Sequence, residues 1–401
     1  MSWSSIEFPE TIRKTKVGRE NQIPSSDIQA TGFFPVVDQG QAFIAGYSDE
    51  EERVIRDDLP MVIFGDHTRC LKYVDFPFIL GADGTKVLKP KEDLFEPKFF
   101  YYALLSLDIP NRGYNRHFTI LKEKTFPHPE KDEQQKISAL LSVVQRAIEQ
   151  QERLLALTAE LKKTLLHQLF TQGLRGEPQK QTEIGRVPES WDVVTLGSLA
   201  KVGNGSTPKR DNEAYWQNGS IPWLNSAKIY DRFISEADQF VTELAAKECH
   251  LPRVKSGSLL IAITGQGKTL GNSALVTFET CINQHLAYAQ FNTSTVIPEF
   301  VLWFMQTRYE HLRSVGLGGG STKGALTCGF LKTYPIPLPS LSEQREIADV
   351  FATLDRKEKV HEGKHAALTD LFRTLLHQLM TAQIRVHDLD LPELEIAGAG
   401  L

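Results

Sequence analysis

The 401-residue sequence has few cysteines, no long apolar run and no excess of basic residues. Its four cysteines, Cys70, Cys249, Cys281 and Cys328, have no paired or C-x-x-C spacing, which argues against a disulfide framework or a zinc site. The longest apolar runs, such as Leu259–Ile263, are far shorter than the roughly 20 residues that span a bilayer. The first residues lack the basic and apolar regions of a signal peptide. We therefore expect a cytoplasmic protein with no membrane partner.

The charge balance does not identify a class of partner. The formal net charge is −5, with 45 basic and 50 acidic residues. Residues 1–132 carry 17 basic and 21 acidic side chains, and residues 186–342 carry 14 and 12. If the protein binds DNA, its basic groups must gather on one face, which a sequence does not reveal.

Motifs for catalysis are also scarce. The segment Thr264–Thr269 is similar to the end of a P-loop, but Ala262 stands where that motif needs its first glycine. An autonomous P-loop enzyme is an alternative, which ATP binding by the isolated chain would reveal. Asp66 and His67 follow an apolar strand, but a single Asp-His pair favours a structural or base-reading role over catalysis. The sequence lacks the glycine-rich cofactor loop and the Asn/Asp-Pro-Pro-aromatic motif of base methylation. We predict no catalytic site, no metal and no cofactor in this chain.

An internal duplication organises the sequence. The segment Thr164–Thr171 recurs as Thr374–Thr381, which is an offset of 210 residues. The same offset aligns Glu133-Gln134 with Glu343-Gln344 without a gap. This period is too long for a solenoid and indicates a duplicated pair of domains.

Each copy is predicted to end in a long helix, the first over about 133–170 and the second over about 343–380. Ser342 is the expected N-cap of the second helix. The polar segment Asp355–His365, with Gly363, predicts a weaker middle. Apolar residues at spacings near 3.5 predict that the helices pack against each other. These pairing residues are Ile137, Leu141, Val144, Ile148, Leu155, Leu165, Leu169, Ile347, Phe351, Leu354, Leu375 and Leu379. A generic coiled-coil dimerisation rod is the simpler alternative.

A mixed, strand-rich region precedes each helix. Strands are expected at Val36–Val37, Met61–Phe64, Phe78–Leu80, Ser258–Ile263 and Ala274–Val276, and helices at Pro97–Leu107 and Pro298–Val315. The indicated fold class is α+β, with two globular α/β domains that alternate with two long helices packed against each other as a coiled coil. The expected boundaries are 1–132 for the first domain, 133–170 for the first helix, 171–190 for a polar linker, 191–342 for the second domain, 343–385 for the second helix and 386–401 for an acidic tail.

Several clusters of polar and aromatic residues are suited to nucleic acid. Arg, Lys, Asn and Gln pair with base edges, and glycine lets the backbone approach a phosphate. Any one of these clusters could equally be a solvated loop, but they occur at comparable points of both copies. The candidate DNA contacts are Gln39, Gln41, Tyr47, His67, Arg69, Lys72, Arg112, Tyr114, Arg116, His117, Thr207, Lys209, Arg210, Trp223, Asn225, Gln266, Lys268, Thr269 and Lys323.

Seven segments resemble a known family: Glu183–Trp191, Trp191–Leu199, Gly205–Pro208, Ile221–Trp223, Gly257–Gly265, Asn283-Gln284 and Ile336–Gln344. Together with the duplication, they are similar to the specificity subunit of type I restriction–modification systems. The resemblance covers essentially the whole chain. Gly32–Gly40 and Gly65–Thr68 are expected to have no counterpart in the second domain.

The resemblance implies a non-catalytic subunit that binds double-stranded DNA. Two target-recognition domains, held apart by two long antiparallel coiled-coil helices of the same chain, would each read one half of a bipartite site. Two modification subunits would supply adenine methylation that depends on S-adenosylmethionine, and two restriction subunits can add ATP- and Mg-dependent translocation and cleavage. An inhibitor that binds modification subunits without reading DNA is a further alternative.

Overall fold

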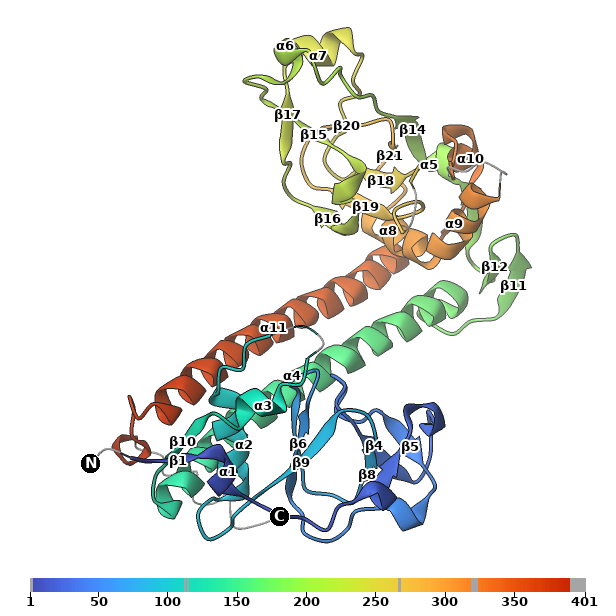
Figure 1. The fold of residues 1–401 in the computed structure, drawn as a ribbon. Helices are drawn as coiled ribbons and strands as arrows, with labels where there is room; N and C mark the ends of the chain where they lie inside the picture. The colour runs from blue at the N-terminus through green and yellow to red at the C-terminus, as the bar shows by residue number, and fades with distance from the viewer. Residues whose placement is uncertain (1–2, 112, 114, 266–267, 319–323, 390–401) are drawn as a thin grey trace. The chain divides into compact units, whose positions relative to one another are not determined.

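The computed structural model describes residues 3–111, 113, 115–265, 268–318 and 324–389, and the chain divides into two compact units. Unit 1 comprises Met1–Arg153 and Glu362–Leu401, and unit 2 comprises Leu154–His361. The elements of each unit are labelled in Figure 1. Among the described residues, no helix is both long and apolar enough to cross a membrane.

Unit 1 contains two four-stranded sheets. The first has the order β2-β9-β6-β7, with antiparallel neighbours, and the second has the order β3-β8-β4-β5, in which β8 runs parallel to both β3 and β4. A separate antiparallel pair joins β1 to β10. The strands are β1 (Ser4–Glu7), β2 (Ile12–Arg13), β3 (Gln22–Ile23), β4 (Phe34–Val37), β5 (Gly46–Ser48), β6 (Met61–Gly65), β7 (Leu71–Val74), β8 (Ile79–Gly81), β9 (Thr85–Pro90) and β10 (Thr125–His128).

Unit 2 contains a five-stranded sheet of order β14-β21-β18-β19-β16 and a three-stranded sheet of order β17-β15-β20. Strand β15 is parallel to β20, and β13 pairs with β22 in a separate antiparallel ladder. The strands are β11 (Gln179–Thr182), β12 (Gly185–Pro188), β13 (Asp192–Thr195), β14 (Ala200–Asn204), β15 (Ile221–Leu224), β16 (Phe233–Ile234), β17 (Gln239–Val241), β18 (Leu259–Ala262), β19 (Ser273–Val276), β20 (Cys281–Ile282), β21 (Leu286–Phe291) and β22 (Pro335–Leu338).

Short helices connect or cover these sheets. The α-helices of unit 1 other than the two long ones are α1 (Phe8–Thr11), α2 (Pro97–Ser106) and α3 (Phe118–Leu121). Those of unit 2 are α5 (Leu196–Leu199), α6 (Glu213–Trp216), α7 (Glu243–Glu248), α8 (Pro298–Thr307), α9 (Tyr309–Leu317) and α10 (Cys328–Thr333). The 3₁₀ turns are η1 (Arg19–Asn21), η2 (Ser25–Asp27), η3 (Glu51–Arg53), η4 (Ser226–Tyr230) and η5 (Val386–Asp388). A proline at the first position of α2 and of α8 suits a helix start, since that residue needs no N–H partner.

The two units share one topology. Strands β1, β2, β4, β6, β7, β8, β9 and β10 have the same order and mutual pairing as β13, β14, β15, β18, β19, β20, β21 and β22. The expectation that Gly32–Gly40 and Gly65–Thr68 have no counterpart is therefore wrong at the level of the fold. The first segment contains β4, which corresponds to β15, and the second begins at the end of β6, which corresponds to β18. The amino acids of the corresponding segments differ because only the buried strands have to keep the same packing in both units, whereas the loops do not.

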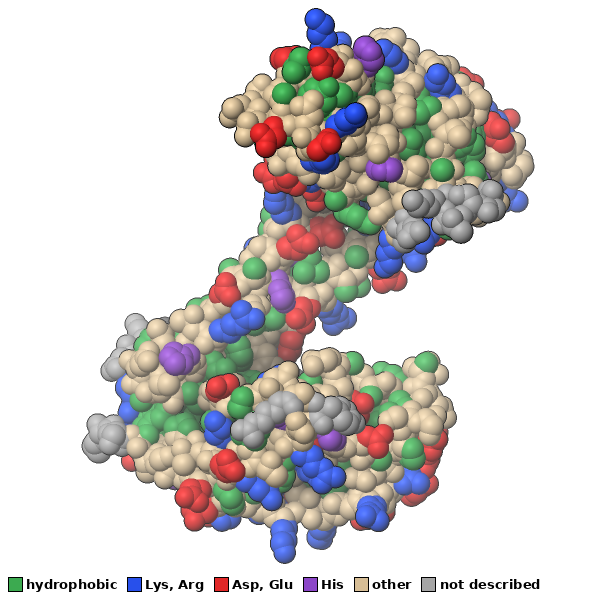
Figure 2. Space-filling model, turned by 45° about the horizontal axis from the view of Figure 1, so that its top comes forward, with side chains coloured by type: hydrophobic (Ala, Val, Ile, Leu, Met, Phe, Trp, Pro, Cys, Tyr) green, Lys and Arg blue, Asp and Glu red, His purple; other side chains and the backbone are tan. Residues whose placement is uncertain are grey.

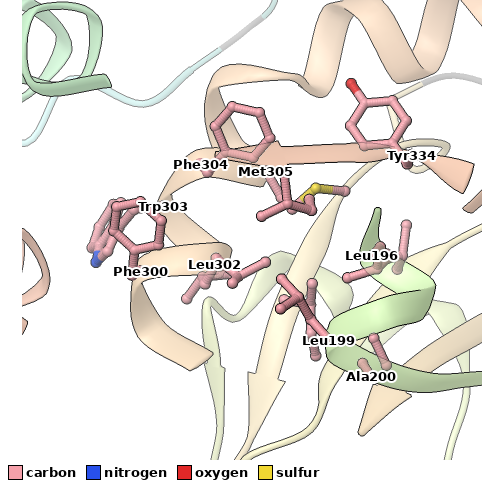
Figure 3. Close-up of a cluster of buried hydrophobic side chains, with 14 of the residues drawn as sticks. Leu196, Leu199, Ala200, Phe300, Leu302, Trp303, Phe304, Met305 and Tyr334 are labelled. Atoms are coloured by element: carbon pink, nitrogen blue, oxygen red, sulfur yellow. The ribbon is translucent and has the colours of Figure 1, made fainter. Parts of the chain in front are cut away.

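The core of unit 2 lies between the five-stranded sheet and helices α5, α8 and α10. Helix α8 buries six consecutive residues from Phe300 to Met305, and they pack with Leu196, Leu199 and Tyr334 (Figure 3). Burial on all sides explains why this helix shows no polar face. The expected helix Pro298–Val315 is in fact two helices, because Arg308 separates α8 from α9.

The long helices are α4 (Lys131–Gln172) and α11 (Leu341–Met380). In unit 1, Ile137, Leu141 and Leu379 are buried in one core with α2, and Val144 is buried while Leu375 packs on that core. In unit 2, Leu169, Ile347, Phe351 and Leu354 are buried in one core, and Leu165 packs on it. Ile148 and Leu155 are half-buried. Within each unit, the apolar residues of α4 and α11 thus pack against each other and also against the globular part of that unit.

Three local expectations differ from the structure. Ser340, not Ser342, accepts the backbone N–H of Glu343 at 3.3 Å, because α11 begins at Leu341. Helix α11 continues through Gly363 without a break, although a weaker middle was expected, and it ends at Met380, as expected. The supposed polar linker 171–190 holds the hairpin β11–β12, and Val187 is buried there.

The expected acidic tail also begins inside the fold. Val386 is 4% exposed and belongs to the core of unit 1, and Arg385 pairs with Glu133 at 2.8 Å. Residues 390–401, which hold most of the tail's acids, lie outside the described residues.

Buried glutamines explain one part of the duplicated sequence. Gln134 is fully buried, accepts the backbone N–H of Glu96 at 2.8 Å and donates to the carbonyl of Pro129 at 2.9 Å. Gln344 accepts the N–H of Ile297 at 2.8 Å and donates to Pro339 at 2.9 Å. Each amide therefore ties the start of a long helix to the start of the aromatic helix beside it, α2 or α8.

Candidate nucleic-acid interface

One edge of the main sheet of unit 2 collects polar loop residues. Strands β14 and β18 end at this edge and β21 begins there, because both are antiparallel to β21. Thr207 follows β14, Thr264 follows β18, and Gln284 and His285 precede β21. We call these four residues the unit 2 loop cluster.

Hydrogen bonds connect the unit 2 loop cluster. The Thr207 hydroxyl donates to the amide oxygen of Gln284, whose amide nitrogen lies 3.2 Å from His285 Nε2. The Thr264 hydroxyl lies 2.5 Å from His285 Nδ1. Gln284 and His285 are exposed, so the cluster offers amide and imidazole groups at the surface.

A glycine fixes the backbone beneath this cluster. A Cβ atom on Gly205 would lie 1.9 Å from the carbonyl oxygen of Ile282, so no other residue fits without a shift. The close approach is stabilised by Ser206, whose backbone N–H donates to that carbonyl at 3.0 Å. Thr207 is thereby held over the β20–β21 turn.

Unit 1 carries polar residues at the corresponding edge. Gln39 follows β4, His67 follows β6 and Asp83 precedes β9. With Asp38 they form the unit 1 loop cluster, which lines an open pocket of about 330 Å³. The amide oxygen of Gln39 accepts the backbone N–H of His67 at 3.2 Å. Gly84, with φ +64°, brings the chain so close that a Cβ there would lie 2.6 Å from the Gln39 amide.

The two loop clusters overlap in position, because His67 and Thr264 follow the corresponding strands β6 and β18, and Asp83 and Gln284 precede β9 and β21, but they differ in chemistry. Unit 1 presents two carboxylates, an amide and an imidazole, whereas unit 2 presents two hydroxyls, an amide and an imidazole. Such groups donate and accept hydrogen bonds as base edges do. In the described part of the chain, no group of three or more His, Cys, Asp or Glu side chains could hold a metal.

Several candidates from the sequence are exposed near these edges. Arg116 is exposed at the start of α3, Gln41 is exposed in the β4–β5 loop, and Lys209 and Lys268 are exposed in unit 2. Arg210 stacks on two indole rings, and the Thr269 hydroxyl lies 2.8 Å from that of Tyr230. Arg112, Tyr114, Gln266 and Lys323 lie outside the described residues.

Other candidate residues are buried and have structural roles. Lys72 is 3% exposed and its ammonium donates to the carbonyl of Ala42 at 2.6 Å, so it fixes the β4–β5 loop. His117 is fully buried, with Nδ1 2.9 Å from the carbonyl of Asp66. Trp223 is 2% exposed. Their burial argues for supporting roles and against direct contact with a ligand.

Three more candidates have structural hydrogen bonds. Arg69 donates to the carbonyl of Ile109 at 2.8 Å, and Asn225 accepts the N–H of Ala227 at 2.8 Å as the cap of η4. Tyr47 is half-buried opposite Pro35. Sequence reasoning missed Thr264, Gln284, His285, Asp38 and Asp83 as site residues. The polar triplet Asn283–His285 between two apolar runs was the available signal.

The loop after β18 does not have the geometry of a P-loop. A P-loop leads directly into a helix whose N-terminus faces the phosphates. Here Lys268 and Thr269 are followed by β19, which is antiparallel to β18. The loop is therefore a connection within a sheet, and the nucleotide-binding alternative loses its structural basis.

Comparison with known proteins agrees with the duplication. A family model described as the type I restriction modification DNA specificity domain matches residues 19–159 and again 188–370. The specificity subunit of the Escherichia coli type I restriction enzyme EcoR124I/EcoR124II is 24% identical over 340 residues, covering 83% of this chain and 82% of that protein. The putative MjaX specificity subunit of Methanocaldococcus jannaschii is 26% identical over 323 residues, covering 77% and 73%.

A solved structure shares the fold. The S subunit of the type I restriction-modification system from M. genitalium has a TM-score of 0.61 at 18% identity, covering 94% of this chain and 96% of that one. At this identity the likeness concerns the fold alone. With two copies of the domain model spread over most of the sequence, the chain belongs to the type I restriction–modification DNA specificity family.

Proposed function

We propose that this chain is the DNA-reading subunit of a type I restriction–modification enzyme and has no catalytic activity itself. Each unit reads one half of a bipartite double-stranded site. The observation that carries the proposal is the pair of loop clusters: one scaffold occurs twice, with different hydrogen-bonding groups at the same edge. Equivalent scaffolds with different loops are suited to two different half-sites.

Partner subunits supply the chemistry in this proposal. We infer that two modification subunits bind the chain and methylate adenine with S-adenosylmethionine, and that restriction subunits add ATP- and Mg-dependent cleavage. Helices α4 and α11 act as an antiparallel coiled spacer that sets the distance between the half-sites. In unit 2, Leu154, Leu157 and Leu161 of α4 are 40%, 51% and 48% exposed and share one helix face. Exposed apolar stripes of this kind are typical of protein interfaces.

The distribution of surface charge supports a DNA-reading subunit that acts within a complex. Basic and acidic side chains are interspersed on the visible face of each unit, without a broad basic surface (Figure 2). Phosphate contacts supply most of the sequence-independent affinity for DNA. We therefore expect the isolated chain to bind DNA weakly and the partner subunits to contribute much of the affinity.

The test is a domain exchange in cells that also carry the modification subunit. Residues 14–91, which hold the unit 1 loop cluster, are replaced by the equivalent segment of a relative, while α2 and both long helices stay native. Methylome sequencing should then show a change in one half of the methylated motif and no change in the other. The matched exchange of residues 200–291 should change only the other half.

Two results would contradict the proposal. The first is a change of both halves by either exchange. The second is methyl transfer, or ATP hydrolysis, by the purified chain alone. An inhibitor without DNA-reading function would give no methylated motif that depends on either segment.

A further inference from the structure

Arg210 is held in a fixed orientation at the surface of unit 2. Its guanidinium carbon lies 3.9 Å from the ring centroid of Trp216 and 4.9 Å from that of Trp223. The two indoles meet edge to face, with their centroids 5.2 Å apart and an interplanar angle of 88°. Arg210 Nη2 also donates to the amide oxygen of Gln239 at 2.7 Å. Two rings and one hydrogen bond together define the plane of the guanidinium.

The loop that carries Arg210 is itself anchored. The indole N–H of Trp216 donates to the carbonyl of Lys209 at 3.0 Å, and that of Trp223 donates to Ser206 at 3.2 Å. Trp223 is buried on β15, so its hydrogen bond fixes the loop to the sheet. The same loop carries Thr207 of the unit 2 loop cluster.

Most of the hydrogen-bonding capacity of Arg210 is unused. A guanidinium has five N–H donors in a planar fork, and one contact to Gln239 leaves the others available. Arg210 is exposed, and it forms no ion pair with any residue in the described part of the chain. In contrast, Arg253 of the same unit is bound by the carboxylate of Glu243 at 2.7 Å. Arg210 is thus preorganised for a partner outside the chain.

We infer that Arg210 is a specificity-determining residue that recognises guanine in the half-site read by unit 2. The inference rests on the proposed function. The O6 and N7 atoms of guanine form a planar pair of acceptors in the major groove, and arginine is their commonest bidentate partner. Phosphate can be bound by the point charge of a lysine as well as by a guanidinium fork, and the neighbouring exposed Lys209 is suited to that role, which leaves the fixed fork of Arg210 for a base edge.

The test uses the complex of this chain with its modification subunit. The methylated motif is first determined by methylome sequencing. Duplexes are then made in which each guanine of the unit 2 half-site is replaced, one at a time, by 7-deazaguanine, which lacks the N7 acceptor. For the native complex, one replacement should weaken binding measurably more than the others, by no more than the roughly 5- to 150-fold expected for loss of a whole bidentate base contact, because O6 remains.

The variants separate base recognition from charge. Arg210→Ala should lose sensitivity to that single replacement, whereas Arg210→Lys, which keeps the charge but not the planar fork between the two indoles, should retain at most part of it. Lys209→Ala is the matched control, and it should weaken binding to all duplexes by a similar factor while keeping the guanine dependence. Thermal unfolding of each variant checks that unit 2 remains folded.

Three outcomes would overturn the inference: a unit 2 half-site without guanine, an Arg210→Ala complex that keeps the guanine dependence, or an Arg210→Ala complex that weakens all duplexes equally, which would indicate a phosphate contact. A native complex with no sequence preference would instead contradict the proposed function. The two failures are therefore distinguishable.

Discussion

The indole nitrogen of Trp191 donates a hydrogen bond to the carboxylate of Glu343 at 3.1 Å. Trp3 and Glu133 repeat this contact in unit 1, also at 3.1 Å. In both units a tryptophan on or beside the first strand of the β1–β10 or β13–β22 ladder meets the first turn of a long helix. The duplicated Glu-Gln pair therefore connects the long helix to two other elements. The glutamate bonds to the tryptophan beside the two-stranded ladder, and the glutamine bonds to the start of the aromatic helix, α2 or α8.

We predict that Glu343→Ala destabilises unit 2 by about 1–3 kcal/mol, because the Trp191 N–H and the backbone N–H of Leu174 lose their acceptor in a buried place. Asp349→Ala, on the exposed side of the same helix, is the control and should have little effect. Urea unfolding followed by tryptophan fluorescence measures both, since four of the five tryptophans lie in unit 2. Equal stability of the two variants would contradict the assigned role of Glu343.

A second prediction concerns the charges where α4 meets α11 in unit 2. Lys162 is 8% exposed, forms an ion pair with Asp355 and donates to Glu358 at 3.0 Å, while Arg232 binds Asp355 at 2.9 Å. Asp355→Ala should cost about 1–3 kcal/mol, because a nearly buried ammonium and a guanidinium lose their shared partner.

A double-mutant cycle isolates this contact. Lys162→Met combined with Asp355→Ala should cost less than the sum of the single changes, because with methionine at 162 the loss of Asp355 no longer deprives a nearly buried ammonium of this partner. Lys163→Ala, exposed on the adjacent position, serves as the control. Additive effects of the two substitutions would show that the Lys162–Asp355 pair contributes nothing to stability.

A third prediction is a dependence of unit 1 stability on acid. Burial alone would raise the pKa of Asp58, but the hydrogen bond from Arg13 and the charge of Lys89 outweigh it and hold this pKa below its usual value. A carboxylate whose pKa is lower in the folded protein stabilises it above the unfolded pKa, near 4. That stabilisation is lost as the pH falls through the folded value.

Asp58→Asn should therefore flatten the loss of stability below about pH 4, as measured by thermal unfolding across a pH series. Asp57→Asn, at the exposed neighbouring position, provides the comparison. If the acid limb of the Asp58→Asn curve matched that of the native protein, the Arg13–Asp58–Lys89 cluster would not be the source of the acid sensitivity.

The fourth prediction tests the proposed DNA-reading edge of unit 2. Lys255 and Lys268 are both exposed and lie at opposite ends of β18, with Lys268 on the side of the unit 2 loop cluster. In the complex with the modification subunit, Lys268→Ala should weaken DNA binding and flatten its salt dependence, because one phosphate contact is lost.

Lys255→Ala removes the same charge from the opposite end of the strand and should leave binding unchanged. Fluorescence anisotropy at several salt concentrations distinguishes the two variants. A larger effect of Lys255→Ala would mean that DNA lies at the other edge of the sheet.

The sequence alone was sufficient for the duplication and the existence of the long helices, because repeats and apolar periodicity are local patterns. Fully apolar runs such as Leu259–Ile263 also marked buried strands. Helix ends were less predictable: α11 passes through Gly363 although glycine costs about 1 kcal/mol in a helix. Packing elsewhere along such a long helix offsets that cost.

The candidate sites were harder to predict, since they depend on contacts between distant segments. Nothing local distinguishes Lys72, which is buried, from Lys268, which is exposed. The shared edge of Thr207 and Gln284 arises only when β14 pairs with β21. Strand pairing across about 80 residues therefore had to be known before these residues could be recognised as one cluster.

The division of the chain also sets an order for folding during synthesis. Unit 2 is continuous, so all of its residues are synthesised before Glu362–Leu401, the last part of unit 1. Unit 1 needs Leu379, Met380 and Val386 to complete its core around Phe8 and Phe126. The domain that is synthesised first is therefore the last to complete its core, and Phe8 and Phe126 lack these apolar partners until the second long helix has been made.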